Sequence, residues 1–145
     1  MKLESIRPEI RSAIEAAQDK QAGNLTVLHL AGAGAFAEYF LLCSGSSGRQ
    51  IQTISEAVEE RLDREGARLR HREGKHGAEW VLLDYGSFVV HIFSERARTY
   101  YDLERLWRSA ERLDIAQPGE MLGTEASNEA GRGAGSQMSS GTNDR

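Results

Sequence analysis

Cysteine, proline and long apolar runs are all scarce in this sequence, which has one cysteine and two prolines among 145 residues. The single cysteine, Cys43, excludes a disulfide within the chain and a metal site built from several thiolates. No apolar run approaches the roughly 20 residues that a membrane-spanning helix needs, and no secretory signal precedes the first helical pattern. We therefore predict a cytoplasmic protein in a reducing compartment, with no membrane partner.

Positive charge is also in short supply, with 18 lysines and arginines against 22 aspartates and glutamates and a formal net charge of -4. Such a chain has no general attraction for nucleic acid, so an RNA contact needs a local basic patch. The stretch from Arg64 to Lys75 is the candidate, but acids interrupt it and it has no aromatic side chain on which bases can stack. A solvated edge is the default, no sequence-specific nucleic-acid binding is expected, and an RNA-contacting assembly factor is an alternative.

Catalytic and metal-binding patterns are missing as well. The four histidines have no H-E-x-x-H or comparable spacing, and no serine has the G-x-S-x-G context of a nucleophile elbow. A triad of a loop serine with His91 and Asp84 would depend on unknown distances. Cys43 lies inside an apolar strand pattern, where cysteine is usually inert. We predict a protein that is no enzyme, with no catalytic residue, no cofactor and no metal.

Three helical patterns are present. The first begins at Pro8, a favoured residue of a first turn, and Gly23 is its expected end. The second runs from Arg49 to Glu65 with Gly66 as its end signal, and the third begins after Ser94. The sides expected to be buried carry Ile10, Ala13, Ile14 and Ala17; Ile51, Ile54, Val58 and Leu62; and Ala97, Tyr100, Leu103 and Trp107.

The strand patterns are shorter and rich in β-branched and aromatic residues. They predict strands at 25–30 and 38–44, a charged edge strand at 68–72, and a β-hairpin within 79–93. The fold class is therefore α/β (α+β), a mixed β-sheet of about five strands flanked by three helices. The glycine-rich segment AGAGAFA between the first two strands is expected to be flexible.

The end of the chain differs in composition from the rest. After Gln117 it is rich in glycine, serine, glutamate and asparagine and nearly devoid of large apolar residues. Such a segment cannot offset the entropy lost on ordering. We predict one folded domain at residues 1–116 and a disordered tail at residues 117–145.

The hairpin EWVLLDYGSFVVHIF has two different faces, if Tyr85 and Gly86 form its two-residue turn. One face is wholly apolar and must lie beneath helices. The other mixes large apolar groups with an acid and an imidazole, which is typical of a binding surface. The apolar face carries Val81, Leu83, Phe88, Val90 and Ile92, and the mixed face carries Trp80, Leu82, Asp84, Ser87, Val89, His91 and Phe93.

The two tryptophans have different interpretations. Trp107 is expected to be a core anchor. For Trp80, the acid and the imidazole on the same face leave two interpretations open, a core anchor or a hot spot of an interface, where tryptophan is over-represented.

The loop SGSSGRQ, Ser44 to Gln50, joins a strand to the second helix and has two candidate roles. A glycine-rich turn at a helix start can hold a phosphate on free backbone N–H groups. This loop lacks the Lys-Ser/Thr ending of a P-loop and the spacing G-x-G-x-x-G. Ser47 and Gln50 instead form the S-x-x-Q pattern of a capping box. Capping is favoured, and a nucleotide-binding enzyme using this loop is the alternative.

Three segments, in this order, resemble the Iojap-related ribosomal silencing factors, called RsfS in bacteria: EYFLLCSGSSGRQIQTISEAVEERL, EWVLLDYGSFVVHIF and RTYYDLERLW. The resemblance runs from the first helix to about Trp107. It implies a nucleotidyltransferase-like topology without the catalytic site. It also implies a translational repressor that binds the large ribosomal subunit through its intersubunit-face protein numbered fourteen and blocks joining of the small subunit when nutrients are limiting. The oligomeric state stays open, with a homodimer off the ribosome as one candidate.

The family's characteristic residues fall on particular positions of this chain. Its tryptophan and D-Y-G turn match Trp80 and 84–86, its valine-histidine strand matches 90–91, and its tyrosine-aspartate-leucine-glutamate helix matches 101–104. Glu38 and Ser87 depart from the family pattern, and AGAGA replaces a more polar loop. The paired carboxylates of nucleotidyltransferases are absent here, because no D-x-D or D-x-E accompanies Asp84. The candidate partner-binding residues are Trp80, Leu82, Asp84, Tyr85, His91, Tyr101 and Glu104.

Overall fold

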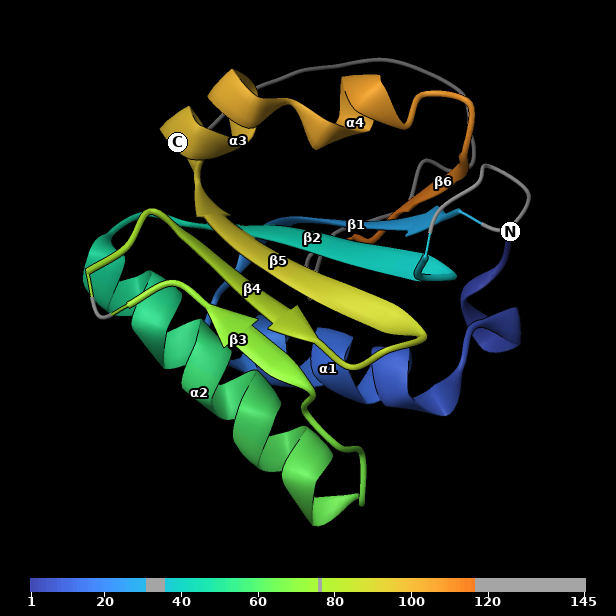
Figure 1. The fold of residues 1–145 in the computed structure, drawn as a ribbon, viewed down its shortest axis with the longest axis horizontal. Coiled ribbons are helices and arrows are strands. Elements are labelled where there is room, and N and C mark those ends of the chain that lie inside the picture. The colour runs from blue at the N-terminus through green and yellow to red at the C-terminus, as the bar shows by residue number, and fades with distance from the viewer. Residues whose placement is uncertain (31–35, 76, 117–145) are drawn as a thin grey trace. The chain divides into compact units, whose positions relative to one another are not determined.

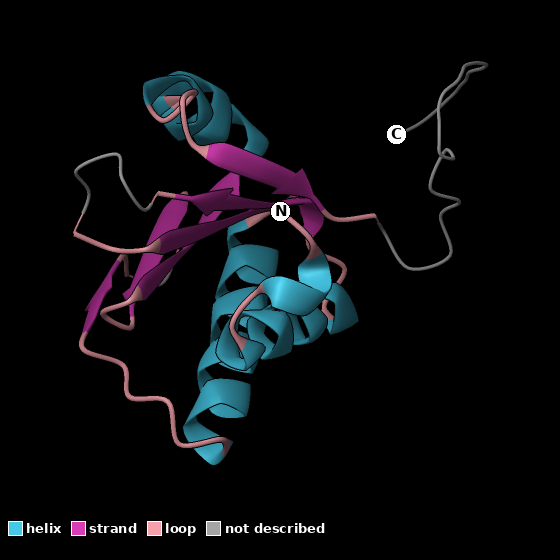
Figure 2. Cartoon of the chain, turned by 90° about the vertical axis from the view of Figure 1, so that its right-hand side faces the viewer, coloured by secondary structure: helices cyan, strands magenta, loops and turns pink. Residues whose placement is uncertain are grey.

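The computed structural model describes residues 1–30, 36–75 and 77–116. The predicted flexible segment lies mostly outside these residues, and the predicted tail at 117–145 lies wholly outside them. The chain from Met1 to Ile115 forms one compact unit. It is a mixed sheet with α1 and α2 on one face and α3 and α4 on the other (Figure 1), so the predicted fold class is confirmed. Figure 2 shows the sheet as a layer between these helices.

The helices are a short 3-10 turn η1 (Leu3–Ser5), α1 (Pro8–Asp19), α2 (Gly48–Arg64), α3 (Glu95–Tyr101) and α4 (Leu103–Leu106). The strands are β1 (Gly23–His29), β2 (Tyr39–Gly45), β3 (His71–Glu73), β4 (Trp80–Asp84), β5 (Phe88–Ser94) and β6 (Glu111–Asp114).

In the part of the chain that the structure describes, the sheet has six strands in the order β3-β4-β5-β2-β1-β6. Only β2 and β5 run parallel; the other neighbouring pairs are antiparallel. The sixth strand, β6, was not predicted, because ERLD has no alternation of apolar and polar residues. Its ladder to β1 is reinforced by a side-chain bond from Thr26 Oγ1 to Asp114 Oδ1 at 2.8 Å.

The main core lies between the sheet and the pair α1 and α2. All eight apolar residues predicted for the buried sides of these helices are buried.

The end of α1 differs from the prediction. Gly23 was predicted to end the helix, but it is the first residue of β1. The helix ends at Asp19, and Gln21 takes the left-handed conformation with φ 65. The Ala22 N–H then bonds to the Ala17 carbonyl at 3.0 Å, in the pattern of a Schellman cap.

The hairpin turn lies one residue later than predicted. Gly86, with φ 89, and Ser87 form the turn, and β4 pairs with β5 so that Leu82 lies opposite His91. The predicted register, which set Leu82 opposite Val89, is therefore wrong by two residues. A shift of two leaves the strand side chains on their predicted faces, because side chains alternate with a period of two. Ser87, predicted on the mixed face, lies in the turn instead.

The predicted third helix is broken. Asp102 takes the left-handed conformation, φ 51 and ψ 52, and separates α3 from α4. Ala97, Leu103 and Trp107 pack against the sheet as predicted. Tyr100 does not, since the structure leaves it 79% exposed.

Candidate functional site

The mixed face of the sheet is only partly covered by α3 and α4. A second, smaller core lies beneath these helices, built on Leu28, Leu42 and Phe93. Phe40 packs against this core, and beyond it the face is half-buried at Leu82, Asp84 and Val89. Aromatic rings gather where the covered and open parts meet. We call Phe40, Trp80, His91, Phe93, Tyr101 and Trp107 the aromatic cluster.

His91 lies at the centre of the aromatic cluster and is 3% exposed. Trp80 Nε1 donates a hydrogen bond to His91 Nδ1 at 3.1 Å. Burial lowers the pKa of His91 to about 3, so the imidazole is neutral, and its proton must lie on Nε2. Nε2 makes no hydrogen bond to any part of the chain that the structure describes. The nearest ring is Phe40, whose centroid lies 4.5 Å from that of His91 at an interplanar angle of 65°.

Trp80 joins this buried centre to the surface. Its ring stacks on Phe93 with centroids 5.1 Å apart, and it lies 4.6 Å from the ring of Tyr101, which is 51% exposed. Trp80 itself is half-buried. Both interpretations of Trp80 therefore describe part of its environment, because one side of the ring packs in the core and the other reaches the edge of the open face.

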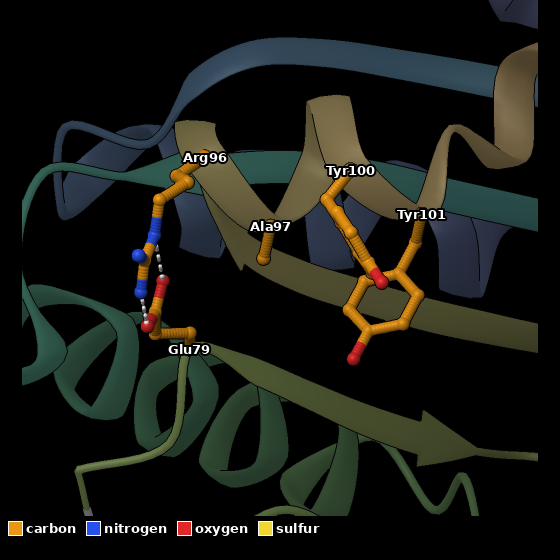
Figure 3. A pocket seen from close by; sticks show the side chains of 5 residues that line it. All are labelled: Glu79, Arg96, Ala97, Tyr100 and Tyr101. Atoms are coloured by element: carbon orange, nitrogen blue, oxygen red, sulfur yellow. Dashed lines mark hydrogen bonds and ion pairs between the residues drawn. The ribbon is translucent and has the colours of Figure 1, made fainter.

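A small pocket of about 210 Å³ adjoins Tyr101 (Figure 3). The Glu79–Arg96 ion pair bounds one side, and Tyr100 and Tyr101 bound the other. Bonds from Arg96, and then from the Ser94 hydroxyl, lower the pKa of Glu79 and keep it charged. The tyrosine rings with a polar rim suit one side chain of a partner better than a whole small-molecule ligand.

The predicted site residues do not all lie together. Leu82 and Asp84 share the mixed face with Trp80 and His91. Asp84 Oδ1 also accepts a bond from the Gly86 N–H at 2.8 Å, which stabilises the hairpin turn. Tyr85 lies on the opposite, helix-covered face with the main core.

Tyr85 is thus separated from the other candidates. It stacks on Phe88 with ring centroids 5.1 Å apart. Burial, with smaller effects of Glu59 and Asp63, raises the pKa of Tyr85 to about 12. Asp84, the last residue of β4, lies on the mixed face. Because side chains alternate between the two faces along a strand, the next residue, Tyr85, points to the opposite face.

Glu104 has internal partners. Its carboxylate accepts bonds from Arg98 Nε and a terminal Arg98 nitrogen, each at 3.1 Å, and pairs with Arg112 at 2.9 Å. The bonds from Arg98 are the main cause that lowers the pKa of Glu104. If Glu104 contacts a partner, as predicted, its carboxylate must do so while it keeps its bonds to Arg98 and Arg112.

Arg98 is the important residue that the sequence analysis missed. It is only 7% exposed, and it also donates to the Asn24 carbonyl, the Ser44 hydroxyl and the Thr26 hydroxyl. These bonds tie α3 and the start of α4 to β1 and β2. An arginine at a helical position normally indicates a solvated side, and no sequence signal distinguished this one.

The loop Ser44 to Gln50 is occupied by its own side chains. Ser47 Oγ accepts the Gln50 N–H at 3.0 Å, which confirms the predicted cap. Gln50 Oε1 bonds to the Ser46 N–H at 2.6 Å, one residue before the position that a capping box predicts. Gln50 Nε2 donates to the Lys20 and Gln21 carbonyls. The side chains of Gln50 and Ser47 therefore take up two backbone N–H groups that a phosphate could use, those of Ser46 and Gln50.

Within residues 1–30, 36–75 and 77–116, no group of three or more histidine, cysteine or acidic side chains could hold a metal ion. No helix in the same ranges is long and apolar enough to cross a membrane.

Comparisons with known proteins agree with the fold. Residues 3–141 match the family described as "Ribosomal silencing factor during starvation". The chain is 38% identical over 106 residues to the ribosomal silencing factor RsfS of Bacillus subtilis, which covers 73% of this chain and 90% of that protein. It is 31% identical over 109 residues to an Iojap-related mitochondrial protein of Arabidopsis thaliana, covering 69% of this chain and 55% of that one.

Two crystal structures show the same architecture. One, from Chromobacterium violaceum, has a TM-score of 0.68 and 27% identity, and covers 82% of this chain and 98% of that one. The other, from Bacillus halodurans, has a TM-score of 0.64 and 32% identity, and covers 73% of this chain and 96% of that one. The chain therefore belongs to the RsfS family of ribosomal silencing factors, proteins of translation regulation related to Iojap.

Proposed function

We propose that this protein represses translation by binding the large ribosomal subunit through its intersubunit-face protein numbered fourteen. It then blocks joining of the small subunit by occupying that face, and it acts in the cytoplasm. The family resemblance suggests the partner. The observation that carries the proposal is the half-open aromatic cluster, with Trp80 and Tyr101 at its edge.

The cluster has the features of a protein-binding surface. Two apolar side chains on the open part of the sheet face, Leu82 and Val89, are half-buried. Leu82 lies opposite His91, and Val89 lies opposite Asp84. Truncating a tryptophan at the centre of an interface typically costs about 2 kcal/mol or more of binding free energy. Asp84, at the rim, supplies an orienting negative charge for a basic partner.

The buried network supports the surface from below. His91 accepts the Trp80 N–H, and this bond fixes the plane of the indole. Arg98 and Glu104 hold α3 to α4 and so fix Tyr101 beside Trp80. Glu104 and His91 thus act mainly through the residues that they position.

We further propose that the protein has no catalytic activity. The nucleotide-enzyme alternative needs free N–H groups in the loop Ser44 to Gln50, and side chains of the loop already occupy two of them, those of Ser46 and Gln50. Metal- and nucleotide-dependent thermal stabilisation of the purified protein would contradict this part of the proposal.

Co-sedimentation with isolated large subunits tests the binding. We expect the wild type to pellet with the subunits, and Trp80→Ala to bind at least about 30-fold more weakly, in line with a hot spot of about 2 kcal/mol. Leu3→Ala, at an exposed apolar residue of η1, is the matched control and should bind as the wild type does. No pelleting of the wild type would refute the proposed partner, and equal binding of Trp80→Ala would refute only the mapped surface.

A further inference from the structure

We propose that a groove on the outer side of α3 and α4 binds single-stranded RNA. This goes beyond the proposed function, which requires contact with a ribosomal protein alone. The groove has a volume of about 840 Å³ and is lined by Tyr100, Tyr101, Asp102, Arg105, Leu106 and Arg108, among others. It combines exposed rings with exposed arginines, the two elements by which proteins hold single strands.

The arginines of the groove are not neutralised by the fold. Other arginines of this region are paired with carboxylates: Arg96 with Glu79, Arg98 with Glu104, and Arg112 with Glu104 and Asp114. Arg105 and Arg108 are exposed, and neither makes an ion pair with a residue that the structure describes. Asp102, which is half-buried, is an acid of the groove lining. The groove therefore offers an excess of positive charge on a chain whose net charge is -4.

The apolar part of the groove suits a nucleic-acid base. Tyr100 is 79% exposed and Leu106 is 70% exposed. The ring of Tyr100 meets that of Tyr101 at an interplanar angle of 88°, with centroids 5.0 Å apart. This contact restrains the Tyr100 ring while leaving most of its surface accessible. An acidic peptide would use the arginines but has no need of an exposed ring, so the combination favours RNA.

Tyr100, Arg105 and Leu106 face outward because other residues of the same segment face the sheet. Leu103 and Trp107 lie four residues apart and pack on the sheet. Arg105 and Leu106, between them on the helix, are therefore directed to solvent. Tyr100 lies off the buried side of α3, which carries Ala97 and Arg98, and not on it as the sequence predicted.

Fluorescence anisotropy with a labelled single-stranded RNA of about eight nucleotides, a typical site size, tests the proposal on the full chain. Two phosphate contacts predict that log K falls with log salt with a slope of about -1.4. Tyr100→Ala should weaken binding about tenfold, whereas Tyr100→Phe, which keeps the ring, should not. The double variant Arg105→Gln, Arg108→Gln should remove most of the salt dependence.

The matched control is Arg68→Gln with Arg70→Gln, two exposed arginines in the other basic stretch of the chain. It should bind RNA as the wild type does. Loss of binding in this control but not in the Arg105 and Arg108 variant would overturn the proposal. So would a wild-type affinity of Tyr100→Ala, or equal displacement by a polyglutamate peptide, which would indicate an acidic protein as the occupant.

The assay contains no ribosomes, so its outcome is separate from that of large-subunit co-sedimentation. RNA binding without subunit binding would refute the proposed function but support RNA binding by the groove. Subunit binding without RNA binding would refute only the proposal that the groove binds RNA.

Discussion

The face of the sheet under α1 and α2 is closed by apolar side chains, whereas the face under α3 and α4 mixes rings with a buried histidine and a buried arginine. Leu62 and Ile54 are fully buried on the first face. On the second, Arg98 and His91 are buried among polar partners and rings, and Leu82 stays half-open. From this difference we propose that the first face provides stability and the second provides binding, because a purely structural face gains little from buried polar groups.

The buried arginine gives the largest expected effect. Arg98→Ala leaves Glu104 without its main partner and removes the ties to β1 and β2. Breaking a buried ion pair in this way should lower the free energy of unfolding by about 3–5 kcal/mol. Large-subunit binding should fall as well, because Tyr101 is no longer held beside Trp80. Urea unfolding and co-sedimentation measure the two effects.

The control for this change is Arg105→Ala, an exposed arginine of the same segment. It should change stability by no more than about 0.5 kcal/mol. If Arg98→Ala were equally mild, the network would not be what holds α3 and α4 in place.

A substitution that creates a cavity in the core under α1 and α2 should lower stability without changing binding. Ile54 is fully buried at the middle of α2. Ile54→Ala should lower the free energy of unfolding by about 2–5 kcal/mol, while the folded fraction binds large subunits as the wild type does. Urea unfolding followed by co-sedimentation at low temperature checks both, and a binding defect in the folded protein would contradict the division between the faces.

The buried histidine predicts a dependence of stability on pH. Burial lowers the pKa of His91 from 6.5 to about 3, so between these values the unfolded chain binds the proton that the folded protein excludes. Stability should therefore fall as pH drops below 6.5, by at most about 1.4 kcal/mol per pH unit from this group. His91→Gln should show a shallower slope in urea unfolding measured from pH 7 to pH 4. An unchanged slope would mean that His91 is protonated in the folded state.

The cap of α2 gives the smallest effect. Ser47→Ala removes the acceptor of the Gln50 N–H and should cost about 1 kcal/mol in the free energy of unfolding. Binding to large subunits should be unchanged, because the loop lies at the start of a helix on the closed face. A binding defect with full stability would instead indicate that the loop contacts a ligand.

The patterns with a clear period were predicted correctly. The buried apolar side of α2 follows from a period of 3.6 residues, and the two faces of the hairpin follow from a period of 2. The two faces were assigned correctly although the predicted register was wrong by two residues. The mixed face that carries Trp80, Asp84 and His91 was predicted because an acid and an imidazole interrupted an apolar strand pattern. Its role in binding stays a prediction.

The errors occurred where structure depends on tertiary contacts. The strand β6 exists through its ladder to β1, and the break at Asp102 lies in a helical pattern without glycine or proline. The burial of Arg98 depends on acceptors from Asn24, Thr26 and Ser44, distant in the sequence. Local periodicity contains no information on such contacts.

Subunit joining is the most direct test of the central claim. Isolated large and small subunits are mixed with and without the protein, and the joined ribosome is separated from free subunits by gradient centrifugation. We expect the wild type to reduce the joined fraction in proportion to its occupancy of the large subunit, and Trp80→Ala to leave joining intact at the same concentration. Full joining with the wild type bound to every large subunit would contradict the account.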